Sequence, residues 1–139
     1  MEFIPEDALK LVLAVVAGGL IGAEREYRDK AAGFRTIIFI TIGSTLYTMF
    51  SLGIGNETNP TRIAANIVTG IGFLGAGTIM REKGKVAGLT TAATIWLAAA
   101  IGMAIGAGQY GLAVILIATA MIVLWIFKRR VVSFRPGTS

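Results

Sequence analysis

The chain has 139 residues and a formal net charge of +5 at pH 7, and 55% of its residues are hydrophobic while only 15% are charged. A soluble domain carries about 25% charged residues, and one of this length cannot bury so much apolar surface. High hydrophobicity excludes disorder, glycines without a three-residue period exclude collagen, and the absence of cysteine and histidine excludes disulfides, thiolate zinc sites and histidine-based catalysis. The composition predicts an integral membrane protein.

Runs without Asp, Glu, Lys or Arg predict where the chain crosses the membrane. These runs are 11–23, 36–56, 63–80 and 86–127. A spanning helix needs about 20 residues, so the second and third runs each hold one span and the last run holds two. Three glycines within 106–111 predict the turn between those last two spans.

The first run has 13 residues, which also fits the apolar core of a signal peptide. However, Pro5 followed by Glu6 and Asp7 is typical of a helix N-terminus, whereas a signal peptide begins with positive charge. We therefore expect a spanning helix here, with Lys10 reaching the interface or facing protein. The predicted fold is an all-α bundle of five transmembrane helices over about 5–23, 36–55, 62–80, 88–106 and 110–127, followed by a basic tail over 128–139.

The distribution of lysine and arginine predicts the orientation of the bundle. Basic residues follow the first, third and fifth spans, whereas the connection before the third span carries only Arg62 and the last turn carries none. Since cytoplasmic loops hold the excess of positive charge, the N-terminus is expected outside and the C-terminus in the cytoplasm. Trp125 and Phe127 beside the basic tail, and Tyr110 at the other end of that span, fit two aromatic belts.

The densest charge cluster, residues 24–30, follows the first predicted span. If the helix continues through it, opposite charges lie four residues apart in three pairs: Glu24 with Arg28, Arg25 with Asp29, and Glu26 with Lys30. One interpretation is a helix end with surface ion pairs, each worth no more than a few tenths of a kcal/mol. The other is a functional site at the membrane edge, in which Glu24 and Arg25 pair with other spans or handle an ion.

A polar stripe runs along the third predicted span. Arg62 and Asn66 are one helical turn apart, and Thr69 and Gly70 continue the stripe inward. Such a stripe should face protein or water rather than lipid. We expect an interhelical hydrogen-bond network here, and a substrate site is the alternative.

Small residues predict where helices approach closely. Residues 70–77 match G-x-G-x-x-G, but a dinucleotide site is excluded because an apolar helix precedes them and no acid follows at the required spacing. Their glycines favour close packing, and an unwound segment with exposed carbonyls is the alternative. Trp96 is expected to pack inside the bundle, with a partner for its indole N–H. Further small-residue spacings are Gly18 with Gly22, and Ala98 with Gly102 and Gly106.

Five separated motifs resemble the MgtC/SapB family, in that family's order. They are ERE at 24–26, GFRT at 33–36, NPTRIAA at 59–65, GIGFLGAG at 70–77 and GLTTAATIW at 88–96. The resemblance implies a bacterial inner-membrane protein that bears on magnesium starvation, with a regulatory role. It also implies that some members act on the ATP synthase rather than moving magnesium themselves. The residues expected to carry function are Glu24, Arg25, Glu26, Arg35, Thr36, Arg62, Asn66, Gly70, Gly72, Gly75, Gly77, Thr90, Thr91 and Trp96.

Four positions depart from the family's pattern. Asn59 stands where the family commonly has Asp, and Asn66 stands where it has Gln. Thr90 and Leu97 stand where some virulence-linked members have Asn and Cys. These departures argue against a role as a virulence regulator. Many members also carry a soluble C-terminal domain, so this sequence is either a short member or a piece of a longer chain.

The favoured function is a non-enzymatic regulator, linked to magnesium homeostasis, that binds a membrane partner and forms a homodimer. The alternative is an ion or small-solute transporter that uses the Glu24/Arg25/Glu26 cluster, Arg62 and residues 70–77. Magnesium prefers oxygen ligands, and the four charge-free runs hold no carboxylate. An enzyme is not expected because no base is evident beside the serines. No metal, cofactor or nucleic acid is expected to bind. The expected partners are the lipid bilayer, a membrane protein and a second copy of the chain.

Overall fold

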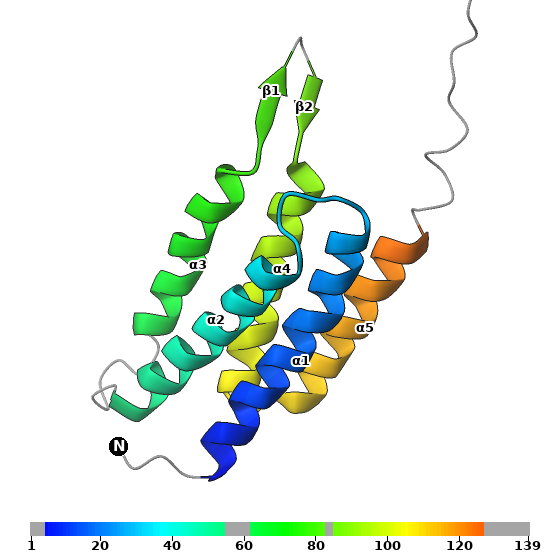
Figure 1. Cartoon of the computed structure of the whole chain (residues 1–139). Coiled ribbons are helices and arrows are strands. Elements are labelled where there is room, and N and C mark those ends of the chain that lie inside the picture. The colour runs from blue at the N-terminus through cyan, green and yellow to red at the C-terminus, as the bar shows by residue number, and fades with distance from the viewer. Residues whose placement is uncertain (1–4, 55–61, 83–84, 127–139) are drawn as a thin grey trace, which may run out of the picture.

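The computed structural model describes residues 5–54, 62–82 and 85–126. These residues form α1 (Pro5–Tyr27), α2 (Phe34–Ile54), α3 (Arg62–Ala76), strands β1 (Met80–Glu82) and β2 (Lys85–Ala87), α4 (Leu89–Gly106) and α5 (Tyr110–Ile126). The helices run up and down, and the two antiparallel strands form a hairpin that projects from one end (Figure 1). The predicted helical bundle is therefore confirmed, with a hairpin that no sequence pattern predicted. The predicted tail 128–139 and Asn59 lie outside the described residues.

Helix α2 packs against both α1 and α4 (Figure 1). It carries a row of buried hydroxyl groups. The Thr41 hydroxyl donates to the Ala14 carbonyl of α1 at 2.9 Å, and the Thr45 hydroxyl donates to the Gly102 carbonyl of α4 at 2.9 Å. Where helices pack without water, such bonds join neighbouring backbones and satisfy each hydroxyl. The buried row on α2 consists of Thr41, Ser44, Thr45, Thr48 and Ser51.

Glycines on both sides allow this close contact with α2. Gly18 and Gly22 of α1, and Gly102 and Gly106 of α4, all face α2. A Cβ added at Gly22 would lie 2.8 Å from the Cα of Phe34, a distance that real Cβ atoms do not reach. The sequence spacings that predicted close helix packing at these glycines are confirmed.

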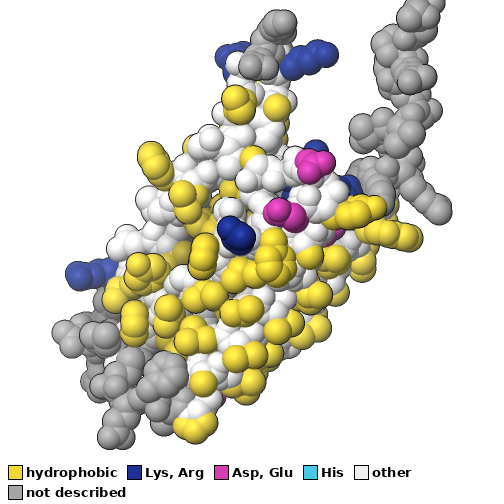
Figure 2. All heavy atoms as spheres, viewed as in Figure 1, with side chains coloured by type: hydrophobic (Ala, Val, Ile, Leu, Met, Phe, Trp, Pro, Cys, Tyr) yellow, Lys and Arg dark blue, Asp and Glu magenta, His cyan; other side chains and the backbone are white. Residues whose placement is uncertain are grey.

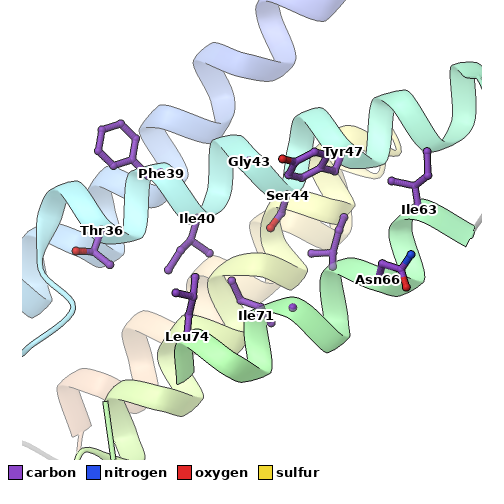
Figure 3. A pocket seen from close by; sticks show the side chains of 12 residues that line it. Thr36, Phe39, Ile40, Gly43, Ser44, Tyr47, Ile63, Asn66, Ile71 and Leu74 are labelled. Carbon is purple, nitrogen blue, oxygen red and sulfur yellow. The ribbon is translucent and has the colours of Figure 1, made fainter. Parts of the chain in front are cut away.

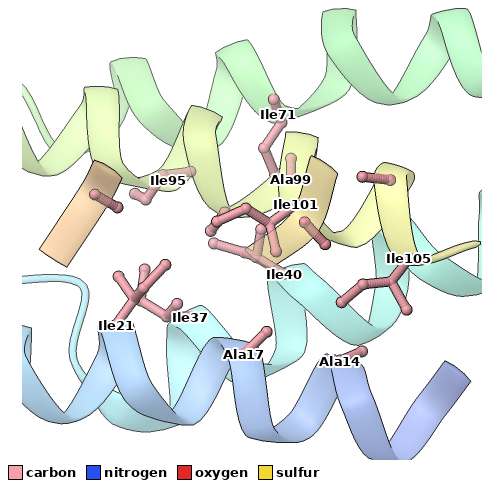
Figure 4. Packing of buried hydrophobic residues seen from close by; sticks show 14 of the residues in the cluster. Ala14, Ala17, Ile21, Ile37, Ile40, Ile71, Ile95, Ala99, Ile101 and Ile105 are labelled. Atoms are coloured by element: carbon pink, nitrogen blue, oxygen red, sulfur yellow. The ribbon is translucent and has the colours of Figure 1, made fainter. Parts of the chain in front are cut away.

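The apolar core is built from alanine and isoleucine (Figure 4). Ile21, Ile37, Ile95 and Ile101 are the largest fully buried apolar side chains, and they come from α1, α2 and α4. Small and branched side chains let three helices converge at short separations, because alanine adds little bulk between the isoleucines. This packing fixes the end of α1 against the start of α4.

Two predicted helix ends require correction. Helix α3 ends at Ala76 rather than at 80, because i→i+3 bonds from the Thr78 and Ile79 N–H groups, each 3.0 Å long, close its last turn. The charge-free run hid this end, since the residues that lead into β1 are themselves apolar. Helix α1 extends to Tyr27, four residues beyond its predicted end at 23, and so carries Glu24 and Arg25 in its last turn.

Length and composition make two helices able to cross a membrane, namely α2 over Phe34–Gly53 and α4, while α3 and α5 are apolar but shorter. Large hydrophobic side chains cover much of the outside, and acidic side chains on the face in view gather toward the hairpin end (Figure 2). Phe39 is 71% exposed and Phe73 is 83% exposed. Apolar surface of this extent marks contact with lipid or protein. The structure agrees with a helical membrane protein.

Candidate functional site

The charge cluster of residues 24–30 lies where α1 ends, at the hairpin end of the bundle (Figure 1). Asp29 has a φ of 51°, and the Lys30 N–H bonds to the Arg25 carbonyl at 3.1 Å while the Asp29 N–H bonds to the Glu26 carbonyl at 3.0 Å. This bond pattern is the Schellman motif, which terminates a helix. Because the helix stops, the predicted Arg25–Asp29 and Glu26–Lys30 pairs do not form in the described structure, and that prediction was wrong.

Glu24 is held between two arginines. Its Oε1 lies 2.5 Å from the Nε of Arg28, which is the one predicted pair that forms, and its Oε2 lies 3.7 Å from Nη1 of Arg25. Arg28 also donates from Nη2 to the Leu124 carbonyl at 2.7 Å, at the C-terminal end of α5. The carboxylate side chain is only 13% exposed. Glu24 therefore fastens the end of α1 to α5 through Arg28.

Arg25 is the most deeply buried charge in this cluster, with a side chain that is 3% exposed. Its Nη2 donates to the Thr91 hydroxyl of α4 at 3.5 Å, and its Nε is buried without a hydrogen bond. Both polar contacts, to Thr91 and to Glu24, lie at or beyond the outer limit of hydrogen-bond length. A buried guanidinium normally has short, well-directed partners. Arg25 thus has donor capacity that the described residues leave unused.

Glu26 has a structural role. Its Oε2 accepts a 2.9 Å hydrogen bond from the backbone N–H of Phe34, the first residue of α2. A carboxylate at this end of a helix satisfies a free N–H and lies at the positive end of the helix dipole. A Cβ at Gly33 would overlap this carboxylate, so the glycine keeps the cap in place. Arg35 and Thr36, which follow in the first turn of α2, are exposed.

A second candidate site is a groove of about 560 Å³ between α2 and α3 (Figure 3). Of the predicted site residues, Thr36, Asn66 and Gly70 line it. Its walls are mainly apolar, with Ile40 and Ile71 pointing into it. The groove and the charge cluster lie on different parts of the bundle, so the predicted residues do not form one site.

The polar stripe of α3 faces outward. Arg62, Asn66 and Thr69 are exposed, and none of their side chains bonds to another helix in the described part of the chain. No interhelical network of these side chains forms among the described residues, and the expected network stays a prediction. The glycines of residues 70–77 differ in how closely other atoms surround them. A Cβ added at Gly70 or Gly72 would have no atom within 4 Å. At Gly75 the added Cβ would lie 3.5 Å from the Ala92 carbonyl of α4, and at Gly77 it would meet only the preceding turn of its own segment.

The predicted site residues of α4 also differ in burial. Thr91 is buried beside Arg25, whereas Thr90 is exposed. Trp96 is 54% exposed, so the prediction that it packs inside the bundle was wrong. Sequence reasoning missed the hydroxyl row of α2, although its spacing of three and four residues from Thr41 to Ser51 is a helical signal. Sequence reasoning placed Lys30 in the charge cluster but did not show that it lines a pocket with Arg25 and Arg28.

Comparison with known sequences identifies the family. The MgtC family model matches residues 11–132. This chain belongs to the MgtC family. The resemblance expected from the five motifs is therefore confirmed.

Several MgtC family relatives share close to half of their aligned residues with this chain. YhiD of Escherichia coli (strain K12), named "Putative magnesium transporter YhiD", is 44% identical over 132 residues, which cover 89% of this chain and 61% of YhiD. Protein MgtC of Brucella abortus (strain 2308) is 47% identical over 105 residues, covering 76% of this chain and 44% of that protein. Protein MgtC of Salmonella typhimurium (strain LT2) is 49% identical over 102 residues, covering 73% and 44%.

The chain spans less than two thirds of the length of each of these relatives. No solved structure matches it. Among the residues that the structure describes, no group of three or more acidic, histidine or cysteine side chains is placed to hold a metal ion.

Proposed function

We propose that this chain is a magnesium-related protein of the bacterial inner membrane that regulates a membrane partner by binding it. Its N-terminus lies outside and its C-terminus in the cytoplasm. Membership of the MgtC family and the name of YhiD support the link to magnesium. The apolar outer surface supports the membrane setting, and the alternation of basic connections supports the orientation.

The open groove between α2 and α3 carries the proposal of partner binding. An amide on a surface that faces hydrocarbon is unfavourable unless it is covered, and Asn66 lies on this exposed side (Figure 3). Gly43 and Gly70 line the groove, and open space beside both of them lets another backbone approach. A concave apolar groove with glycines and one amide suits a single helix laid into it.

The occupant we propose is a transmembrane helix of another protein that carries an acidic side chain near its outer end. Arg62 lies at the start of α3, is exposed, and has no ion pair with any residue of 5–54, 62–82 or 85–126. A carboxylate on the partner would pair with it and would set the register of the two helices. A second copy of this chain is the competing occupant, and it would form the homodimer expected from the small-residue faces.

Photo-crosslinking in cells tests this occupant. A photoreactive amino acid at position 70 should form an adduct with one identified membrane protein, and the adduct should weaken with Arg62→Ala. The matched control is the same probe at position 114 of α5, since Val114 is 65% exposed and no residue of α5 lines the groove. An adduct with a second copy, or equal adducts from both positions, would refute the proposed partner.

Ion flux separates regulation from transport. Glu24 is already engaged by Arg25 and Arg28, which leaves it poorly suited to bind magnesium. Folded protein inserted in liposomes should pass magnesium, sodium and potassium no faster than empty liposomes. Protein-dependent magnesium flux would overturn the regulatory proposal and establish the transporter alternative.

A further inference from the structure

A basic pocket of about 660 Å³ lies at the hairpin end of the bundle, apart from the α2–α3 groove. It is lined by the C-terminal ends of α1 and α5, the connection that follows α1, β2, Gly88 and the N-terminal end of α4. These helix ends lie together at the hairpin end of the bundle (Figure 1). Three cationic side chains line it, namely Arg25, Arg28 and Lys30, and no acidic side chain of the described residues does. Glu24 does not line the pocket but pairs with Arg25 and Arg28. Its one negative charge against three positive charges leaves a surplus of two positive charges at the pocket.

The N-terminal end of α4 adds backbone donors to the same pocket. Gly88 precedes the helix with a φ of 88°, and no side chain in the described part of the chain caps it. The first bond of this helix runs from the Ala92 N–H to the Gly88 carbonyl at 2.9 Å, so the N–H groups of residues 89–91 precede the intrahelical ladder. Thr90 and Thr91 line the pocket at this turn. The free N–H groups and the dipole of α4 favour an anion at this turn, whereas the C-terminal ends of α1 and α5 across the pocket favour cations such as Arg25 and Arg28.

Arg25 is the second and independent sign of a ligand. Its side chain is 3% exposed, it lines the pocket, and its Nε has no hydrogen-bond partner. Its contacts to Thr91 and Glu24 are long, at 3.5 and 3.7 Å. Within the described structure its one anionic partner is Glu24, at 3.7 Å, so the buried Nε of Arg25 keeps a donor for a closer anion.

We propose that this pocket binds a phosphate group. The planar donor arrays of Arg25 and Arg28 match phosphate oxygens, Lys30 adds a point charge at the rim, and the first turn of α4 adds N–H donors. Two sources share this chemistry: the headgroup of an anionic phospholipid and a free phosphate in solution. The apolar wall formed by Leu89, Val123 and Leu124 lies beside the cations, as an acyl chain would require. The site does not depend on the proposed partner helix.

Thermal unfolding of the full chain in a zwitterionic detergent tests the site. Inorganic phosphate should raise the unfolding temperature above that in chloride at equal ionic strength, or phosphatidylglycerol should be retained over phosphatidylcholine in native mass spectrometry. The first result identifies free phosphate as the source and the second identifies the lipid. If neither phosphate nor phosphatidylglycerol produced its expected effect, the proposal would be overturned.

Two variants with a matched control show whether the pocket is responsible. Lys30→Gln removes an exposed charge that makes no ion pair within the described structure, and it should weaken binding about fivefold without loss of folding. Arg25→Gln should weaken binding about tenfold or more. The control, Lys85→Gln in β2, removes an equal exposed charge at the same end but outside the pocket lining. Equal losses from Lys30→Gln and Lys85→Gln would mean non-specific attraction and would refute the site.

Discussion

The Thr45 hydroxyl of α2 donates a 2.9 Å hydrogen bond to the Gly102 carbonyl of α4, where the missing side chain of the glycine lets the two backbones meet. Gly102→Ala should therefore destabilise the bundle by about 1–3 kcal/mol, because the added methyl would lie 2.9 Å from the Ser44 Cβ and force the helices apart. Unfolding in detergent measures the loss. Gly43→Ala is the control, since an added Cβ there meets no atom within 4 Å. Equal stability of the two variants would contradict this account.

Glu24 keeps two arginines paired, so its charge should matter more than its shape. Glu24→Gln should cost about 3 kcal/mol of unfolding free energy, because it leaves the buried Arg25 and the nearby Arg28 without a counter-charge. Glu6→Gln is the control, because Glu6 pairs with Lys10 at 3.2 Å on the surface. That control should cost less than about 1 kcal/mol, with a loss that shrinks in salt. A smaller loss for Glu24→Gln than for Glu6→Gln would rule out the buried clamp.

Glu26 caps α2, so its acceptor atom should matter more than its charge. Glu26→Ala should lower stability by about 1 kcal/mol, because the Phe34 N–H loses its acceptor. Glu26→Gln keeps an oxygen acceptor and should recover most of that loss. Thermal unfolding of both variants measures the difference. If glutamine were no better than alanine, the dipole and not the hydrogen bond would be responsible.

Arg62 should matter for activity and not for folding. Because it is exposed and makes no ion pair with a described residue, Arg62→Ala should leave the unfolding temperature unchanged. It should nevertheless reduce growth at low magnesium in cells that depend on this chain, by loss of the contact with the partner helix. Full growth with a well-expressed Arg62→Ala protein would remove Arg62 from the candidate site.

The close helix contacts could be predicted because their signal is local. Gly18 and Gly22 lie on one helical face, as do Gly102 and Gly106, and such spacing directly marks a contact surface. Spacing does not reveal which partner covers a face. The stripe that begins at Arg62 could therefore be recognised as polar, but its spacing could not show that no side chain of the described residues meets it.

The burial of individual side chains and the end of α1 could not be predicted from the sequence. The charges of residues 24–30 read as a continued helix, and only the left-handed Asp29 shows that the helix stops and that two of three predicted pairs are lost. Arg25 and Arg28 belong to the same charge cluster, yet only Arg25 is almost fully buried, beside Thr91 of α4. The prediction for Trp96 was wrong because a central position along a helix does not show which face of the helix points inward, and Trp96 is exposed.

The Thr41 hydroxyl has one proton but three carbonyl oxygens within reach: Ala14 of α1 at 2.9 Å, and Ile37 and Ile38 of its own helix at 3.2 and 2.9 Å. Rotation of the hydroxyl exchanges one acceptor for another without leaving the group unsatisfied. A small shift of α1 along α2 would therefore still leave the Thr41 hydroxyl with an acceptor. The glycines hold α1 and α2 at one close separation, whereas the hydrogen bond of Thr41 between them can change its acceptor.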